Sequence, residues 1–253
     1  MFNRLGSFVV SYFINLGGIT QLAFRFFRSM FSPYKLYNKV INQVYLLGIQ
    51  SLPITIITSV FIGMAFTLQI VLEFEKFGAN FLLGGIVGLA IWRELAPLLT
   101  GVAVSARIGA AIASELGTMR VTEQIDALKT LSQDPVKYLV VPRILAVMIM
   151  MPLLVGVADG VGFMSGFFVG VPMANINPNA YFSSAINMLE PFDIIGGLIK
   201  ALVFGFLIGV IGCYQGLNTK AGAKGVGIST THAVVKTIIS IFVVNYFLSY
   251  LLF

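Results

Sequence analysis

Charged residues are scarce in this 253-residue chain. Asp, Glu, Lys and Arg make up 10% of it, whereas soluble domains carry about 25%. Hydrophobic residues make up 58%, and the mean hydropathy is +0.94. So little polar surface cannot coat a globule in water. The apolar runs are continuous and do not alternate with the period of two that a membrane β-barrel requires. The sequence therefore predicts an all-α protein that crosses the membrane several times.

The residues that build common catalytic and metal sites are nearly absent. The one cysteine, Cys213, excludes both a disulfide and a cysteine-based zinc site within one chain. The one histidine, His232, has no H-E-x-x-H motif around it, so we expect no metal site. The chain also lacks a G-x-S-x-G motif and a G-x-x-x-x-G-K-[ST] phosphate loop, and the glycine-rich stretch 221–230 has a different spacing. We therefore expect no enzyme and no cofactor on this chain, so that any ATP and Mg²⁺ would bind to another subunit.

The first 45 residues differ from the rest. The stretch 8–24 is apolar but interrupted by polar residues, and it is shorter than the ~20 residues of a spanning helix. Arg25, Arg28, Lys35 and Lys39 follow it. This pattern favours a helix that lies in the membrane interface, with its basic residues toward anionic headgroups, and leaves a spanning helix as the alternative. We assign residues 1–45 to this helix and a basic linker, and residues 46–253 to a membrane domain.

Five apolar stretches are long enough to cross a hydrocarbon core about 30 Å thick. They are 46–72, 81–113, 144–171, 194–217 and 237–253. The asparagine-rich stretch 172–191 is predicted to be a short exposed loop. All of the 16 Lys and Arg residues except Lys76, Arg93 and Lys200 fall on one side of this arrangement. The positive-inside rule makes that side cytoplasmic and places the C-terminus outside. The net charge of +6 is thus explained by topology, without a nucleic-acid partner.

One long polar segment, 115–135, lies on the cytoplasmic side between the second and third stretches. Gly117 is predicted to break the preceding helix, Thr122 to cap a new helix, and Asp134-Pro135 to end it. Val121, Ile125 and Leu128 then share one face at helical spacing. The pattern predicts a short amphipathic helix, and two roles stay open for it. It docks on a soluble partner, or it is an ordinary loop helix with a solvated charged face.

Four charged residues lie deep within the apolar stretches, away from their ends: Arg93, Glu94, Asp159 and Lys200. A charge at the bilayer centre costs about 2.5–3.5 kcal/mol on insertion scales, so such residues usually face a bundle interior or a wet cavity. Because consecutive helix residues point about 100° apart, Arg93 and Glu94 cannot face one partner. Two interpretations stay open. Arg93, Glu94 and Lys200 line a cavity for a charged headgroup, or Glu94 and Lys200 form a buried structural ion pair.

Several glycines recur four residues apart, a spacing that allows helices to approach closely in lipid. These sets are Gly84/Gly88, Gly156/Gly160, Gly162/Gly166/Gly170 and Gly205/Gly209. We expect most of them to pack within the chain, and one such face could serve a homodimer.

The segment 93–146, RELAPLLTGVAVSARIGAAIASELGTMRVTEQIDALKTLSQDPVKYLVVPRILA, resembles the core of the MlaE/YrbE family of permeases, the membrane subunits of MCE-associated lipid ABC transporters. The likeness extends to FIGMAFTLQ (61–69) and to IKALVFGFLIGVIGCYQGLNTKAGAKGVGISTTHAVV (199–235). It covers nearly the whole chain after about residue 40. Ala96, Ala201 and Gln215 stand where the family often has Gly, Ser and Glu, which bears on the polarity of the cavity and not on the fold.

The resemblance implies an N-terminal interfacial helix, five transmembrane helices and an MlaE-type permease domain over 46–253. Its implied partners are a second copy of the chain, cytoplasmic ABC ATPase subunits, a periplasmic MCE-domain protein and phospholipid. It makes 115–135 the coupling segment, which contacts the ATPase, through Glu115, Arg120, Glu123, Asp126 and Leu128. It also places Gln69, Arg93, Glu94 and Lys200 beside a lipid cavity.

The implied function is movement of phospholipid between the inner and outer membranes, which bears on outer-membrane lipid asymmetry. The expected location is the inner membrane, although plastid inner-envelope members share the E-Q-I-D-A-L pattern found at 123–128. Two alternatives stay open. An ion- or proton-coupled carrier would use Glu94, Asp159 and Lys200 as a relay, although the chain lacks the inverted repeat common in such carriers. A scaffold that only anchors partners would tolerate loss of the intramembrane charges.

Overall fold

The computed structural model describes residues 2–30, 36–220 and 222–253, with side chains from 13 to 30, 37 to 220 and 222 to 253. Lys35 of the predicted basic linker and Ala221 of the glycine-rich stretch lie outside the described residues, as does the side chain of Arg4. Within the described residues every regular element is helical. Five of the helical columns are long and apolar enough to cross a membrane: 37–77, 80–121, 136–174, 191–217 and 223–252. The all-α class and the five predicted crossings are thereby confirmed.

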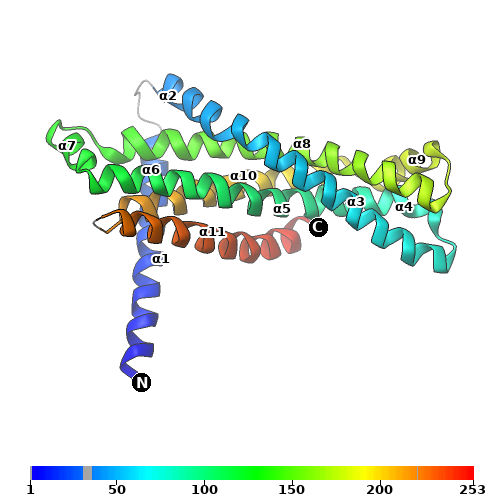
Figure 1. Cartoon of the computed structure of the whole chain (residues 1–253), viewed down its shortest axis with the longest axis horizontal. Coiled ribbons are helices and arrows are strands. Elements are labelled where there is room, and N and C mark those ends of the chain that lie inside the picture. Colours follow the sequence, from blue (N-terminus) through cyan, green and yellow to red (C-terminus); the bar gives the residue numbers. More distant parts are fainter. Residues whose placement is uncertain (1, 31–35, 221) are drawn as a thin grey trace.

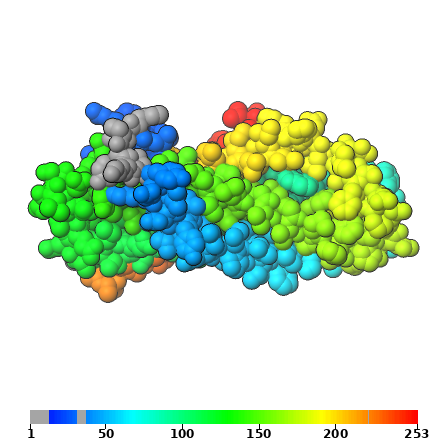
Figure 2. All heavy atoms as spheres, turned by 90° about the horizontal axis from the view of Figure 1, so that it is seen from above, coloured from blue at the N-terminus to red at the C-terminus, as the bar shows by residue number. Residues whose placement is uncertain are grey.

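The five columns run side by side along the long axis of the molecule, whereas α1 (Phe2–Met30) leaves one end of it at a steep angle (Figure 1). The coupling segment lies at that same end, and α9 (Pro178–Met188) lies at the opposite end (Figures 1 and 2). We call these the coupling end and the far end.

The first column begins earlier than its apolar stretch. It joins α2 (Leu36–Gln43), a π-helical segment η1 (Val44–Gly48), a 3₁₀ turn η2 (Ile49–Ser51) and α3 (Leu52–Phe77), so that helix runs through residue 46. Gly78 ends the column in the left-handed conformation, with φ of 65°, which costs glycine little.

The second column is interrupted by two further π-helical segments. It consists of a 3₁₀ turn η3 (Asn80–Leu82), α4 (Leu83–Ala90), π-helical η4 (Ile91–Leu95), α5 (Ala96–Val104), π-helical η5 (Ser105–Gly109) and α6 (Ala110–Val121). The prediction that Gly117 breaks this helix is wrong. Gly117 is buried in α6, and a Cβ there would lie 2.8 Å from the Thr219 hydroxyl oxygen. Glycine destabilises a helix interior by about 1 kcal/mol relative to alanine. Here the close packing of Thr219 on α6, which only glycine allows, offsets that loss.

The third column joins π-helical η6 (Val136–Val140) to α8 (Val141–Ala174). After α9 come α10 (Pro191–Leu217) and α11 (Ala223–Leu252), the fourth and fifth columns. Helix α11 begins 14 residues before the apolar stretch 237–253, because hydropathy marks where lipid begins and a helix can continue into water. The polar residues before 237 therefore hid the first four turns.

The prediction of an exposed loop at 172–191 is also wrong. Within it α9 is an 11-residue helix whose Tyr181 and Ala185, four residues apart, are buried. The asparagine richness has a capping role, since the side chain of Asn177 accepts a hydrogen bond from the Asn179 N–H at 2.9 Å. A Cβ at Gly84 would collide with the backbone of Tyr181, so α9 packs directly on α4.

The first and third columns meet along a seam of small residues. On the first column a buried residue recurs every four positions: Ser51, Thr55, Ser59, Gly63, Thr67 and Val71. The facing residues on α8 are Gly162, Gly166 and Gly170. Gly205 and Gly209 of α10 likewise pack on α8. The prediction that most glycine pairs pack within the chain is therefore confirmed, except that Gly156 and Gly160 have no described atom within 4 Å of an added Cβ.

This seam gives a stability prediction with a matched control on α8. Gly63→Ala is expected to lower the free energy of unfolding by about 1–3 kcal/mol, because the added methyl would collide with the Gly162 carbonyl and the Ser165 hydroxyl. Gly156→Ala meets open space and should not destabilise the chain. Thermal unfolding of the purified protein in detergent would measure both. Equal midpoints for the two variants would contradict the described seam.

Candidate polar network and coupling segment

A buried ion pair joins the second column to the fourth. The Lys200 ammonium on α10 lies 2.7 Å from Glu94 Oε1 on η4 and donates at 2.8 Å to the backbone carbonyl of Arg93. The Lys200 side chain is fully buried, whereas that of Glu94 remains 38% exposed. Lys200 therefore depends on this pairing more than Glu94 does, because its charge has no access to solvent.

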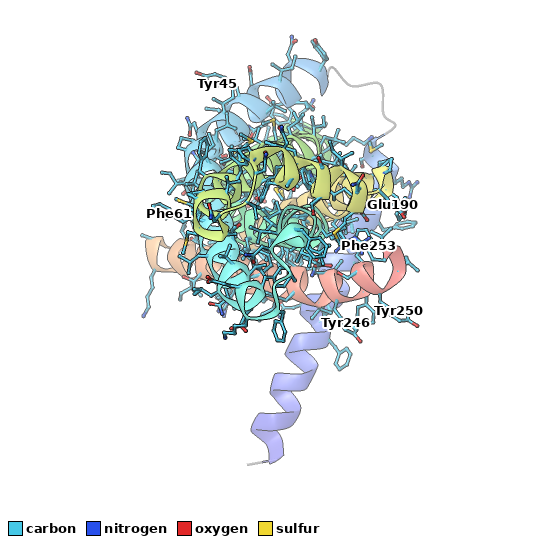
Figure 3. All side chains as sticks on the ribbon, turned by 90° about the vertical axis from the view of Figure 1, so that its right-hand side faces the viewer. Tyr45, Phe61, Glu190, Tyr246, Tyr250 and Phe253 are labelled. Carbon is cyan, nitrogen blue, oxygen red and sulfur yellow. The ribbon has the colours of Figure 1, made fainter. Side chains whose placement is uncertain are left out.

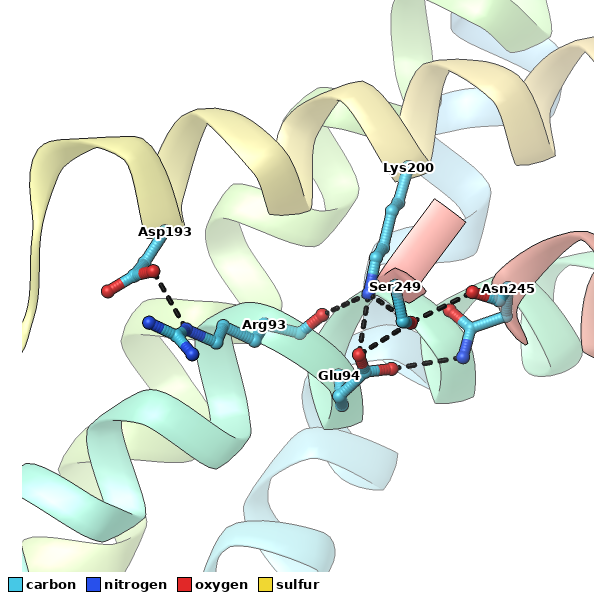
Figure 4. A network of polar contacts seen from close by, with 6 residues as sticks. All are labelled: Arg93, Glu94, Asp193, Lys200, Asn245 and Ser249. Atoms are coloured by element: carbon cyan, nitrogen blue, oxygen red, sulfur yellow. Dashed lines mark hydrogen bonds and ion pairs between the residues drawn. The ribbon is translucent and has the colours of Figure 1, made fainter. Parts of the chain in front are cut away.

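The fifth column completes the ligation of the Glu94 carboxylate. Ser249 donates to Glu94 Oε1 at 2.7 Å, and the Asn245 amide donates to Oε2 at 3.0 Å (Figure 4). The Ser249 hydroxyl also accepts a hydrogen bond from Lys200 at 2.8 Å. Since Asn245 and Ser249 are one helical turn apart on α11, they present both groups to the same carboxylate. Three columns are thus tied together at one point inside the apolar bundle.

Arg93 takes a different direction from Glu94, as its position next to Glu94 on a helix predicts. Its Nε donates at 2.7 Å to Asp193, whose side chain is 2% exposed (Figure 4). Asp193 also accepts the backbone N–H of Glu190 at 2.9 Å, and the two residues form a capping box at the start of α10. A second ion pair therefore fixes the beginning of the fourth column against the second.

The sequence reasoning missed Asp193, Asn245 and Ser249. Two local signals were present, the E-P-F-D spacing of a capping box at 190–193 and the four-residue separation of Asn245 and Ser249. Neither signal names the partner, which lies 100 residues away for Arg93 and Asp193 and 151 residues away for Glu94 and Asn245.

Two predicted polar residues do not join this network. Gln69 is exposed on α3, and no hydrogen bond or ion pair of the described residues links it to Arg93, Glu94 or Lys200. Asp159 is 3% exposed on α8, and its Oδ1 has no hydrogen-bond partner in the described part of the chain. The ion pair of Glu94 and Lys200, one of the two interpretations left open by the sequence, is present. Because Glu94 is partly exposed, the pair is also compatible with the other interpretation, a cavity for a charged headgroup.

The coupling segment is a sharp corner followed by a very short helix. The predicted N-cap Thr122 instead ends α6, and Glu123 begins α7 (Gln124–Thr130) with a left-handed φ of 60°. Ser132, at φ 57°, makes a second corner, so α7 ends before Asp134-Pro135, which was predicted to end it. Asp134 instead accepts the Val136 N–H at 2.9 Å and starts the third column. Non-glycine residues rarely adopt such φ values, so tertiary contacts hold these corners in place.

Ion pairs between residues of the coupling segment stabilise the corner. Asp126 accepts hydrogen bonds from Lys129 at 2.8 Å and from Arg120 at 2.7 Å. These bonds from Lys129 and Arg120 hold the pKa of the Asp126 carboxyl below its ordinary value, so the group stays charged at neutral pH. Ile125 is the buried residue of α7, and Leu128 packs against the same core cluster, whereas Glu123 and Leu131 are exposed. The apolar stripe predicted from the sequence therefore anchors α7, and Glu123 and Leu131 form its outer surface.

Two further side chains tie the coupling end together. Glu115, an exposed residue of α6, pairs with Arg143 on α8 at 3.1 Å, and Arg143 is itself 10% exposed. Arg107, in the π-helical segment η5, donates to the Gln50 amide oxygen at 2.8 Å and also to the Ser51 hydroxyl. The sequence reasoning counted Arg107 only as a loop cation. Its contacts instead brace the irregular part of the first column against the irregular part of the second.

Five apolar columns, a polar network buried among them and an exposed charged segment at one end define a multi-pass helical membrane protein. A comparison with protein-family models then identifies the family. The model described as Permease MlaE matches residues 40–251, and the chain belongs to that family.

Curated relatives agree with this assignment. A probable ABC transporter permease protein of Rickettsia felis is 43% identical over 251 residues, which cover 99% of this chain and 97% of that protein. A probable ABC transporter permease protein of Synechocystis is 46% identical over 213 residues, covering 84% and 81%. The Arabidopsis thaliana protein TRIGALACTOSYLDIACYLGLYCEROL 1, chloroplastic, is 42% identical over 213 residues, covering 84% of this chain and 61% of that protein. A role as a transporter permease follows from the family.

Proposed function

We propose that this chain is the membrane subunit of an ATP-driven lipid transporter that moves phospholipid between the inner and outer membranes. The observation that carries the proposal is the coupling segment, an internally ion-paired corner exposed at one end of a chain that has no phosphate loop of its own. The relatives named as ABC transporter permeases support ATP as the energy source. The Arabidopsis relative is named for a galactosylated diacylglycerol, which supports a glycerolipid as cargo.

The second column provides a direct mechanical link in this proposal. Helix α6 runs without a break from the corner at Glu123 into the bundle, and the same column carries Glu94. Nucleotide binding would draw together two partner ATPases and the coupling segments docked on them. The column can bend at the π-helical segment η5, between Glu123 and Glu94, and at η4, which carries Glu94, because π-helical turns disturb the regular hydrogen-bond ladder. The movement would widen or narrow a lipid cavity beside the polar network.

A second copy of the chain would form the other wall of that cavity. Helix α11 is the least buried of the five columns, and Tyr246 and Tyr250 on it point away from the bundle (Figure 3). The same helix carries Asn245 and Ser249, so a partner packed near α11 would lie close to the exposed side of Glu94. Arg93, Glu94 and Lys200 would then border the cavity from this chain, with Gln69 farther out on α3.

The distribution of charge supports an orientation with the coupling end in the cytoplasm. Cations gather at the coupling end, where Arg120, Lys129, Lys137, Lys220 and Lys224 lie, whereas Glu73, Glu75 and Glu190 lie toward the far end. Helix α1, which is steeply inclined to the columns and is not among the five candidate crossings, would lie in the cytoplasmic interface. The far end, with α9, would then face a periplasmic MCE-domain protein, and the C-terminus would lie on the outer side.

The structure offers little to a proton-coupled carrier. A relay needs hydrogen-bonded neighbours, and Asp159 shares no described hydrogen bond with Glu94 or Lys200. The described contacts therefore favour the ATP-driven permease over the carrier.

The proposal is tested by reconstituting the chain, with the subunits that co-purify with it, into liposomes. We expect transfer of a fluorescent phospholipid that requires ATP and persists when a protonophore collapses the proton gradient. A preparation with a non-hydrolysable ATP analogue is the control. Transfer that follows an imposed proton gradient without ATP would overturn the proposal and establish the carrier.

A further inference from the structure

A basic hollow lies where α1 meets the start of the third column. It has a volume of about 340 Å³ and is lined by Arg25, Arg28 and Ser29 of α1 and by Asp134 and Lys137 on the chain leading into α8. Two elements more than 100 positions apart in the sequence thus contribute cations to one concavity. None of the residues of the polar network lines it.

The cations of this hollow are not neutralised within the described chain. No ion pair of the described residues includes Arg25, Arg28 or Lys137, whereas Arg120, Lys129 and Arg143 at the same end have carboxylate partners. The one carboxylate at the hollow, Asp134, uses its Oδ1 to accept the Val136 N–H at 2.9 Å. Three cations and one carboxylate leave an excess of positive charge, which suits a phosphate with its several acceptor oxygens.

A groove lined by both apolar and polar residues adjoins the hollow. This groove has a volume of about 440 Å³, shares Arg25 with the hollow, and is lined between α1 and the end of α10. Ile14, Leu22, Val136, Tyr214 and Leu217 form its apolar part, and Gln21 and Asn218 add polar groups to its lining. The absence of a side chain at Gly18 lets α1 pack closely on Tyr214 of α10, because a Cβ there would collide with the Tyr214 ring.

The order of residues along α1 matches the shape of a lipid. The lining residues of α1 recur at helical spacing along one face, at positions 14, 18, 21, 22, 25 and 28. Apolar Ile14 therefore lies about 16 Å from cationic Arg25 at 1.5 Å per residue. A free phosphate would contact only the cationic part of this stripe, and a nucleotide has no alkyl chain to bury in the apolar part. A phospholipid would contact the cationic part with its phosphate and the apolar part with an acyl chain.

We propose that the hollow and groove together bind one phospholipid with an anionic headgroup. Its phosphate lies between Arg25, Arg28 and Lys137, and an acyl chain follows the groove between α1 and α10. This lipid is separate from any transported lipid near Glu94, and it holds α1 against the bundle. The inference rests on the proposed placement of α1 in the interface, but it requires neither the ATPase nor transport.

The test is a lipid titration of the full chain, purified and delipidated in detergent, followed by native mass spectrometry. We expect dioleoyl-phosphatidylglycerol to bind more tightly than dioleoyl-phosphatidylcholine. The double variant Arg25→Gln/Arg28→Gln should weaken phosphatidylglycerol binding about 30-fold, since each cation near an anionic lipid contributes about fivefold in affinity. Lys220→Gln/Lys224→Gln removes two exposed cations at the same end and should change binding less than twofold.

Further variants separate the headgroup from the acyl chain. Gln21→Trp fills the groove and should weaken phosphatidylglycerol binding while leaving Arg25 and Arg28 in place. Equal affinity for the two lipids, or equal losses in the two double variants, would overturn the proposal. Inorganic phosphate that competes fully with phosphatidylglycerol, together with normal binding by Gln21→Trp, would show a free-phosphate site and would also overturn it. ATP-driven lipid transfer in liposomes is measured separately. The proposed lipid site at α1 and the proposed transport function can therefore be contradicted independently.

Discussion

Asp126→Lys is expected to abolish both association with the ATPase and ATP-driven lipid transfer, while the protein still inserts into the membrane. The substitution replaces the carboxylate that Arg120 and Lys129 share, so three cations would crowd one corner of the coupling segment. Repulsion would open the corner at Glu123 and displace the surface formed by Glu123 and Leu131. The measurement is co-purification of the ATPase with the variant, together with lipid transfer in liposomes. Glu123→Lys should have the same effect by reversing the exposed charge directly.

A matched control exists at the far end. Glu73→Lys reverses a carboxylate that is paired with a lysine three residues away, as Asp126 is, but it lies far from the coupling segment. It should leave ATPase association and transfer intact. A second variant, Asp126→Lys with Arg120→Asp and Lys129→Asp, restores the internal pairing with reversed charges. If the surface charge matters as well as the shape, this variant inserts normally and still fails to recruit the ATPase. Normal transfer by both Asp126→Lys and Glu123→Lys would exclude the proposed coupling role.

Glu94→Ala is expected to destabilise the protein by about 3–5 kcal/mol, the usual cost of removing one partner of a buried pair. It leaves the Lys200 ammonium fully buried, with the Arg93 carbonyl and the Ser249 hydroxyl as hydrogen-bond partners and the Phe253 ring 4.9 Å away, but with no carboxylate. Lys200→Ala should cost less, because Glu94 is 38% exposed and keeps its bonds from Ser249 and Asn245. The double variant should cost less than the sum of the two. Unfolding in detergent, arranged as a double-mutant cycle, would measure the coupling.

The exposed pair of Glu73 and Lys76, at 3.0 Å, is the reference for this cycle. Its coupling should be about 0.2–1 kcal/mol, as for other solvated pairs. The transport assay then separates the two interpretations of the network. Loss of lipid transfer in Lys200→Ala, at a temperature where the variant is folded, would support a cavity that uses these charges. Normal transfer by a folded Lys200→Ala would restrict the pair to a structural role.

Short-range sequence patterns predicted some features of this fold correctly and others wrongly. The number of crossings followed from apolar length, since each stretch must satisfy its own backbone in lipid. The helix ends could not be predicted in the same way. Gly117 resembles a helix break, but its close contact with Thr219 keeps it inside α6. The polar residues before Thr237 resemble a loop, but α11 extends through them into water. Helix α9 was hidden because four asparagines outweighed the buried spacing of Tyr181 and Ala185.

The sequence by itself determined that this is a five-crossing helical membrane protein, where its polar segment lies, and which charges stand inside the apolar columns. These properties depend on composition and on short periods, which are local. Only the tertiary structure decided that Lys200 pairs with Glu94, that Asp193 holds Arg93, that Asn245 and Ser249 complete the network, and that Arg25 and Lys137 face one hollow. Each of these pairings joins helices separated by about 100 residues or more, and only the packing of the helices brings such residues together.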